Sequence, residues 1–223
     1  MRMRRKKNLE NKLADLNNLL IKYSEEKDYR KAAENPEYID FYEIFKNNNP
    51  VYLEIGCGKG QFVAEIASTN PNINFLAVEK NDNVIYAACK KCENLPNVYF
   101  LNSGAEYLPK YIKPNSIGRV YLNFSCPFPK ARYASHRLTA THFLKIYEGL
   151  MQKGAEIHQK TDNRQFFEFS IEHLSDYGFT LKNISLDLHK SDFKGNIVTE
   201  YEARFSSLGF PIYRLEAYLK WRL

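Results

Sequence analysis

The chain has 223 residues, 44% hydrophobic and 14% aromatic, enough for a full hydrophobic core, which excludes a disordered or fibrous protein. No apolar run approaches the roughly 18 residues of a membrane span, and no apolar segment of a secretory signal follows the basic N-terminus. Four cysteines in a chain of this length do not indicate a disulfide scaffold, so we expect a cytoplasmic protein with reduced thiols.

The net charge of +6 is unevenly distributed. Residues 1–7 contain five basic residues, and removing these and a second block leaves 20 basic against 26 acidic residues. The second block, residues 107–147, has no acidic residue and seven basic ones: Lys110, Lys113, Arg119, Lys130, Arg132, Arg137 and Lys145. Charge gathered in this way favours a polyanionic partner, although a solvated basic face is the simpler alternative.

The N-terminal part shows helical periodicity. Apolar residues over 8–30 recur at the spacing of an amphipathic helix, namely Leu9, Leu13, Leu16, Leu20 and Tyr23. A turn signal at residues 47–50 precedes the first strong strand pattern. We therefore expect a basic arm with an amphipathic helix over 1–46 and one domain over 47–223.

From residue 51 onward, strand and helix patterns alternate. Strands are predicted over 51–55, 75–78, 98–101, 120–124 and 155–161, and helices over 61–68, 83–92, 105–111, 139–152 and 163–177. Two further strands, over 181–188 and 211–219, flank a polar stretch. The pattern predicts an α/β fold with a largely parallel, doubly wound sheet and an antiparallel C-terminal edge pair.

A glycine-rich segment follows the first of these strands and opens a helix. Gly56, Gly58 and Gly60 form G-x-G-x-G, which differs from the dinucleotide spacing and from a P-loop. Glu79 ends the second strand, about 20 residues on, where a carboxylate accepts both ribose hydroxyls. Glu54, before the glycines, would repel a pyrophosphate but suits a cationic ligand such as S-adenosylmethionine.

These residues resemble the cofactor site of class I S-adenosylmethionine-dependent methyltransferases, which implies a Rossmann-like fold. Further motifs resemble the bacterial tRNA (guanine-N7-)-methyltransferases; they lie at residues 119–125, 127–130, 137–139, 160–164, 185–189 and 195–202. The resemblance covers roughly residues 50–218 and implies methyl transfer to guanosine 46 of the tRNA variable loop. It also implies substrate-binding roles for Lys130, Asp162, Thr199 and Glu202.

The turn after the fourth strand is the predicted acceptor side. Phe128 offers a stacking surface, and Lys130, Arg132 and Arg137 would hold phosphates. Guanine N7 has a lone pair and no proton, so attack on the methyl group needs orientation and no general base. Recognition should fall on the N1 and N2 donors, for which Asp162, Glu200 and Glu202 are the acceptor candidates, with Asp162 also stabilising developing positive charge.

Two positions that carry Asp in the family differ here. Cys126 replaces a catalytic and cofactor-side Asp in a turn that usually reads Asp-Pro-Trp-Pro, and Phe128 stands in place of the Trp. Gly104 replaces an Asp that contacts the adenosine, so Gly104, Ala105 and Glu106 are the expected contacts, with Glu106 as the substitute carboxylate. We hypothesise that Cys126 lowers catalysis without abolishing it, since no proton must be removed.

Two alternatives remain open. One is an S-adenosylmethionine-binding tRNA module with weakened catalysis; the other is a class I methyltransferase with another acceptor, such as cytosine C5 or a small molecule. Cys89 and Cys92 have metal-like spacing but lie in a helical pattern without a second ligand pair, so we expect no metal. We further expect no membrane partner, and a monomer or homodimer.

Overall fold

The computed structural model describes residues 8–21 and 24–220, which form two compact units divided after Ile112. The basic cluster at residues 1–7 and Tyr23 lie outside the described residues. Within the described residues, no helix is long and apolar enough to cross a membrane. The expected domain boundary after residue 46 stays a prediction.

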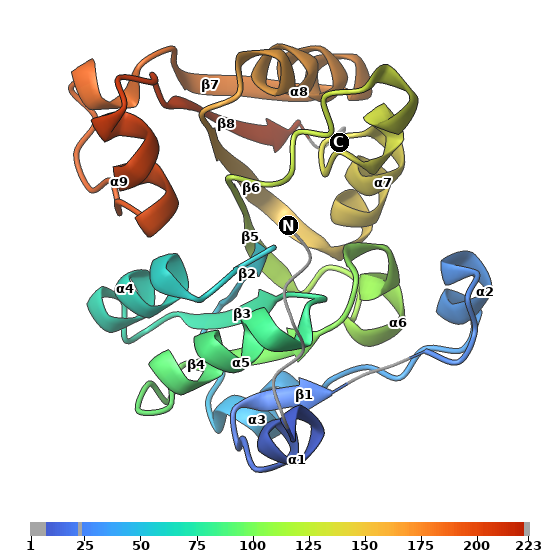
Figure 1. Cartoon of the computed structure of the whole chain (residues 1–223). Helices are drawn as coiled ribbons and strands as arrows, with labels where there is room; N and C mark the ends of the chain where they lie inside the picture. Colours follow the sequence, from blue (N-terminus) through green and yellow to red (C-terminus); the bar gives the residue numbers. More distant parts are fainter. Residues whose placement is uncertain (1–7, 22–23, 221–223) are drawn as a thin grey trace. The chain divides into compact units, whose positions relative to one another are not determined.

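The first unit contains a four-stranded parallel sheet in the order β1-β4-β3-β2 (Figure 1). Leu53, Leu76 and Phe100 are completely buried in it. Its elements are α1 (Leu9–Ala14), β1 (Leu19–Ile21), α2 (Tyr29–Glu34), α3 (Phe41–Phe45), β2 (Val51–Ile55), α4 (Gln61–Thr69), β3 (Asn74–Val78), α5 (Asp82–Lys91), β4 (Val98–Asn102), the short 3-10 helix η1 (Ala105–Tyr107) and α6 (Leu108–Tyr111).

The helix expected over residues 8–30 is wrong for most of its length. Among the described residues of this range, α1 is helical, with Leu9 and Leu13 buried; the chain then enters β1, which pairs with β4, and helix resumes only at Tyr29, where α2 begins. The carbonyl of Asn18 accepts a hydrogen bond from the amide of Phe100 at 2.8 Å. Three consecutive apolar residues beginning at Leu19 suit a strand covered on both faces, and this local signal prevails over the helical spacing.

The second unit pairs β5 with β6 in parallel, and then adds β8 and β7 antiparallel, in the order β5-β6-β8-β7. The predicted largely parallel sheet with an antiparallel C-terminal edge pair is confirmed. Figure 1 shows α8 alongside β7. The elements are β5 (Ile117–Asn123), η2 (Ala131–His136), α7 (Thr141–Leu150), β6 (Met151–Thr161), α8 (Arg164–Tyr177), β7 (Phe179–Ser185), η3 (Leu188–Lys190), α9 (Glu200–Ser207) and β8 (Tyr213–Leu219).

The polar stretch between β7 and β8 contains a helix, α9, that the hydrophobic periodicity did not predict. Thr199 is its N-cap, and the Thr199 hydroxyl accepts a hydrogen bond from the amide of Glu202 at 3.0 Å. The sequence T-x-x-E over residues 199–202 is a capping-box signature and would have indicated this helix start.

One face of β6, β8 and β7 carries a cluster of charged side chains. His158 lies 2.8 Å from a Glu156 carboxylate oxygen, and Lys182 also pairs with Glu156. Arg214 pairs with Glu216 beside them. Burial lowers the pKa of His158 to about 4, and although burial raises that of Glu156, hydrogen bonds from Lys182 and His158 lower it to about 2.

This cluster predicts acid sensitivity. His158 has a lower pKa folded than unfolded, so its contribution to stability falls as pH drops from about 6.5 to about 4, on the order of 2–3 kcal/mol. Glu156 adds a further loss as pH falls from about 4.5 to about 2. Urea unfolding from pH 7 to pH 4 should show the first loss, and His158→Gln should flatten it. An unchanged slope in that variant would contradict the assignment.

Candidate active site

The loop between β2 and α4 holds three glycines in left-handed backbone conformations. The φ angle is +78° at Gly56, +57° at Gly58 and +75° at Gly60, where residues with a Cβ are disfavoured. The amides of Gly56 and Cys57 donate to the carbonyl of Val78, at 2.8 and 3.1 Å. The glycine loop is therefore anchored to the end of the neighbouring strand, β3.

The three glycines differ in their surroundings. A Cβ on Gly60 would lie 2.9 Å from the Cβ of Ala88, so Gly60 lets the loop pack against α5. A Cβ on Gly56 or Gly58 would meet no atom within 4 Å. These two glycines leave open backbone over which a ligand can lie.

Two carboxylates lie at the carboxyl ends of the adjacent strands β2 and β3. Glu54 is only 3% exposed, and half-buried Glu79 accepts a hydrogen bond from the Asn81 amide at 2.9 Å. Burial raises the pKa of Glu79, partly offset by hydrogen bonds from the backbone of Asn81 and Gly58. The bond from Gly58 joins this carboxylate to the glycine loop.

A third carboxylate lies beside Gly104, at the start of η1. A Cβ on Gly104 would be 2.7 Å from both Cδ and Oε2 of Glu106, so this carboxylate covers the space into which a side chain at 104 would extend. Ala105 is buried next to it. The side-chain Nδ2 of Asn102 donates to the Glu79 carbonyl at 3.1 Å, while its buried Oδ1 has no hydrogen-bond partner among the described residues.

The predicted cofactor residues of the first unit therefore lie at or just after the carboxyl ends of the neighbouring parallel strands β2, β3 and β4. Open glycine backbone and carboxylates suit a ligand with ribose hydroxyls and a positive charge, and they disfavour a pyrophosphate.

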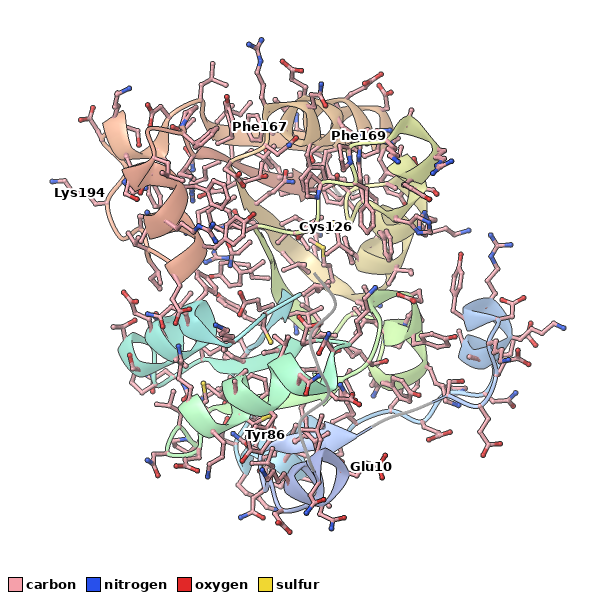
Figure 2. The ribbon with its side chains drawn as sticks, viewed as in Figure 1. Glu10, Tyr86, Cys126, Phe167, Phe169 and Lys194 are labelled. Carbon is pink, nitrogen blue, oxygen red and sulfur yellow. The ribbon has the colours of Figure 1, made fainter. Side chains whose placement is uncertain are left out.

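The acceptor turn, residues 124–130, follows β5 in the second unit. Phe124 and Phe128 have φ angles of +50° and +42°, unfavourable values for aromatic residues. The Cys126 thiol is exposed, and Figure 2 labels it on this turn. The Ser125 hydroxyl is buried and has no hydrogen-bond partner among the described residues. Backbone strain of this kind persists only where surrounding contacts hold it.

Arg137 provides such contacts. Its Nε donates to the Pro127 carbonyl at 2.9 Å and a terminal nitrogen donates to the Phe128 carbonyl at 3.1 Å. The guanidinium lies over the ring of Phe169 on α8, 4.4 Å from its centroid, and Arg137 is 9% exposed. This position differs from the expected phosphate contact and favours a role in holding the turn.

The acid-free basic block is less available to a polyanion than the sequence indicated. Lys110 pairs with Glu37 at 2.8 Å and Arg119 with Glu156 at 3.3 Å, so acidic residues outside the block neutralise both. With Arg137 buried, the exposed cations of the block are Lys113, Lys130, Arg132 and Lys145.

Asp162 follows β6 and its side chain is half-buried. Its neighbours take the local capping roles: the Thr161 hydroxyl accepts from the Asn163 amide, and Asn163 caps α8. Asp162 is therefore not the capping residue of this turn, and burial raises the pKa of its carboxyl. Its placement is compatible with the predicted contact to a base.

Glu202, a predicted acceptor for the guanine edge, is completely buried. Lys160 donates to its Oε2 at 2.6 Å, Asn196 donates to its Oε1 at 2.6 Å, and Nε2 of His189 lies 3.0 Å from Oε1. Lys160 also donates to the carbonyl of Ile197 at 2.7 Å. These contacts attach the start of α9 to β6, and no sequence motif indicated the roles of Lys160, Asn196 and His189 in them.

Two cysteines of the first unit are unsuited to metal binding or nucleophilic chemistry. Cys89 and Cys92 are fully buried, and burial raises the pKa of each thiol to about 12. Both stay protonated thiols packed in the core.

The fold is that of the class I methyltransferases. Among solved structures, a 16S rRNA methyltransferase, KamB, matches with a TM-score of 0.61 at 18% identity over 82% of this chain and 95% of that one. An antibiotic-related methyltransferase matches with a TM-score of 0.58 at 17% identity over 82% and 96%. At these identities the likeness shows the fold alone.

Related sequences identify the methyltransferase family to which the chain belongs. A family model described as a putative methyltransferase matches residues 48–215. A tRNA (guanine-N(7)-)-methyltransferase of Bacillus subtilis is 49% identical over 181 residues, covering 80% of this chain and 84% of the relative. The relative of that name from Geobacillus thermodenitrificans is 43% identical, covering 84% and 92%. The chain belongs to the tRNA (guanine-N7-)-methyltransferase family, which confirms the resemblance.

Proposed function

We propose that this enzyme transfers the methyl group of S-adenosylmethionine to N7 of a guanosine in tRNA, at position 46 of the variable loop. The observation that carries the proposal is family membership over residues 48–215, joined to a glycine loop flanked by carboxylates.

The cofactor-side residues fit S-adenosylmethionine. Gly56 and Gly58 present open backbone, the Glu79 carboxylate would accept the ribose hydroxyls, and Glu54 would suit the amino and sulfonium charges. Glu106, over Gly104, supplies the carboxylate that position 104 lacks. When bound, S-adenosylmethionine would supply an electrophilic methyl group.

The acceptor chemistry explains why an exposed cysteine is tolerable at position 126. Guanine N7 attacks through its lone pair and loses no proton, so the protein must orient the base, which in favourable cases supplies ~7–11 kcal/mol. The ring becomes cationic during transfer, and the Asp162 carboxylate can stabilise that charge. Cys126 removes one negative charge from this region and therefore lowers the rate without abolishing it.

Substrate recognition divides between base and phosphate contacts. Asp162 and Glu200 are acceptors for the N1 and N2 donors of guanine, while Lys130 and Arg132 bind phosphates without reading sequence. Thr199 and Glu202 position α9 through its N-cap and through the bond to Lys160.

The test is to incubate the protein with labelled S-adenosylmethionine and unmodified tRNA, then digest the RNA and identify the labelled nucleoside. N7-methylguanosine supports the proposal. Label in 5-methylcytidine would instead indicate cytosine chemistry, and binding of both ligands without transfer would indicate a non-catalytic module.

Charge reversal on the acceptor side should weaken tRNA binding. The double substitution Lys130→Glu and Arg132→Glu should lower affinity more than tenfold at physiological salt and reduce the log–log salt slope by about 2, since two phosphate contacts are lost. Filter binding across a salt series measures both. Lys31→Glu with Lys153→Glu is the matched control, because these lysines are exposed and lie outside the block. Equal effects of the two pairs would contradict the footprint.

A further inference from the structure

A row of aromatic rings connects the acceptor turn to α9. Phe124, in the turn, lies 5.3 Å from Tyr201 between ring centroids. Tyr201 is stacked on Phe205 at 4.5 Å with an interplanar angle of 26°, and Phe205 contacts Phe210 edge-on at 5.8 Å. We call these four residues the aromatic row.

Tyr201 is the member of the row that combines exposure with contact to the acceptor turn. It is 47% exposed, although Phe124 and Phe205 both contact its ring. An isolated aromatic side chain at a helix surface loses rotamer freedom when a ligand binds it. A ring already stacked on a neighbour has lost much of that freedom, so it forms a prepared binding surface.

The groups near Tyr201 are those that the reaction needs. Burial raises the pKa of Tyr201, and the nearby Asp162 carboxylate and Cys126 thiol raise it further, with Arg204 opposing. The phenol therefore stays neutral, which keeps the ring a suitable partner for a purine face. Asp162 at this position can accept from the N1 and N2 edge of a guanine.

Phe128, predicted from the sequence as the platform, is placed differently. Its ring contacts His136 at 5.5 Å, and Arg137 fixes its carbonyl. Phe128 thus lies in the part of the turn that His136 and Arg137 stabilise.

We propose that Tyr201 is the surface on which the acceptor guanine stacks, with Phe205 as its backing ring. This inference rests on the proposed function and adds the residue that orients the base. Stacking uses the face of the purine and leaves the in-plane N7 lone pair and the N1 and N2 donors unobstructed. A hydrogen bond to N7 would orient the base equally well but would block the reacting atom.

The test compares Tyr201→Leu, Tyr201→Phe and Tyr201→Trp, with Tyr42→Leu as control. Tyr42 is a similarly exposed tyrosine, 53% exposed, in the first unit. Leucine keeps apolar bulk against Phe124 and Phe205 but removes the flat π face. Initial rates of N7-methylguanosine formation in unmodified tRNA give kcat and KM, calorimetry gives the affinity for S-adenosylmethionine, and thermal melting reports the fold.

We expect Tyr201→Leu to lower kcat/KM roughly 10- to 100-fold, the range for loss of one base–aromatic stack. Phenylalanine and tryptophan should restore most of the rate, and affinity for S-adenosylmethionine should be unchanged. A folded Tyr201→Leu enzyme with wild-type rates, or equal losses in Leu and Phe variants, would overturn the inference. If Tyr201→Leu does not fold, Tyr201→Gln takes its place.

Two failures remain distinguishable. If the wild-type protein forms no N7-methylguanosine, the proposed function fails, and this inference fails with it. If the wild type is active and Tyr201→Leu is equally active, the function stands and only the stacking role is lost.

Discussion

Replacing Gly60 with alanine should destabilise the protein by about 2–5 kcal/mol. The left-handed backbone at φ +75° costs a residue with a Cβ about 1–2 kcal/mol. The new methyl group would also lie 2.9 Å from the Cβ and 3.0 Å from the Cα of Ala88, and overpacking of this kind costs about 1–3 kcal/mol. Differential scanning calorimetry should show a fall in Tm of roughly 5–15 °C.

Gly58→Ala is the matched control, because its Cβ meets no atom within 4 Å. Only the cost of the left-handed backbone conformation applies, so the fall in Tm should be about half as large. Its methyl group would project over the open backbone where we place the cofactor, so affinity for S-adenosylmethionine should fall at least tenfold. Equal melting temperatures for the two variants would contradict the different roles of the two glycines.

Lys160→Met should strongly destabilise the second unit. It leaves the Glu202 carboxylate, which is 0% exposed, without its cation, and breaking a buried pair in this way costs about 3–5 kcal/mol. Tm should fall by roughly 10 °C. Adding Glu202→Leu should recover much of the loss, because no unpaired charge then remains buried.

Asp162→Asn, two residues after Lys160, should affect activity and not stability. Its half-buried carboxylate is proposed to contact the base, so methylation of tRNA should fall more than tenfold while Tm changes little. If Lys160→Met were as stable as wild type and affected only tRNA methylation, Glu202 would be a substrate contact and not an anchor of α9.

The sequence predicted the sheet and the glycine loop at its strand–helix junction because both depend on local patterns. Apolar runs of about five residues and a strand–glycine–helix junction are visible in a short window. β1 was not predicted because Leu16 and Leu20 happen to continue a helical spacing. α9 was not predicted because the T-x-x-E segment at its start carries no apolar periodicity.

The acceptor side was harder to predict because its roles depend on distant partners. Buried Glu202 pairs with Lys160, 42 residues away in the sequence. The sequence around residue 202 does not indicate this partner. Arg137 was grouped with Lys130 and Arg132 by charge alone. Only the fold shows that its guanidinium faces the carbonyls of the acceptor turn and the ring of Phe169.

Arg137 holds the acceptor turn through main-chain contacts, which makes the turn tolerant of substitutions. The arginine binds main-chain oxygens of Pro127 and Phe128, which every amino acid possesses. The path of the turn is thus largely independent of which side chains it displays. A substitution can therefore change a displayed side chain, such as the one at Cys126, while the main-chain path of the turn is retained.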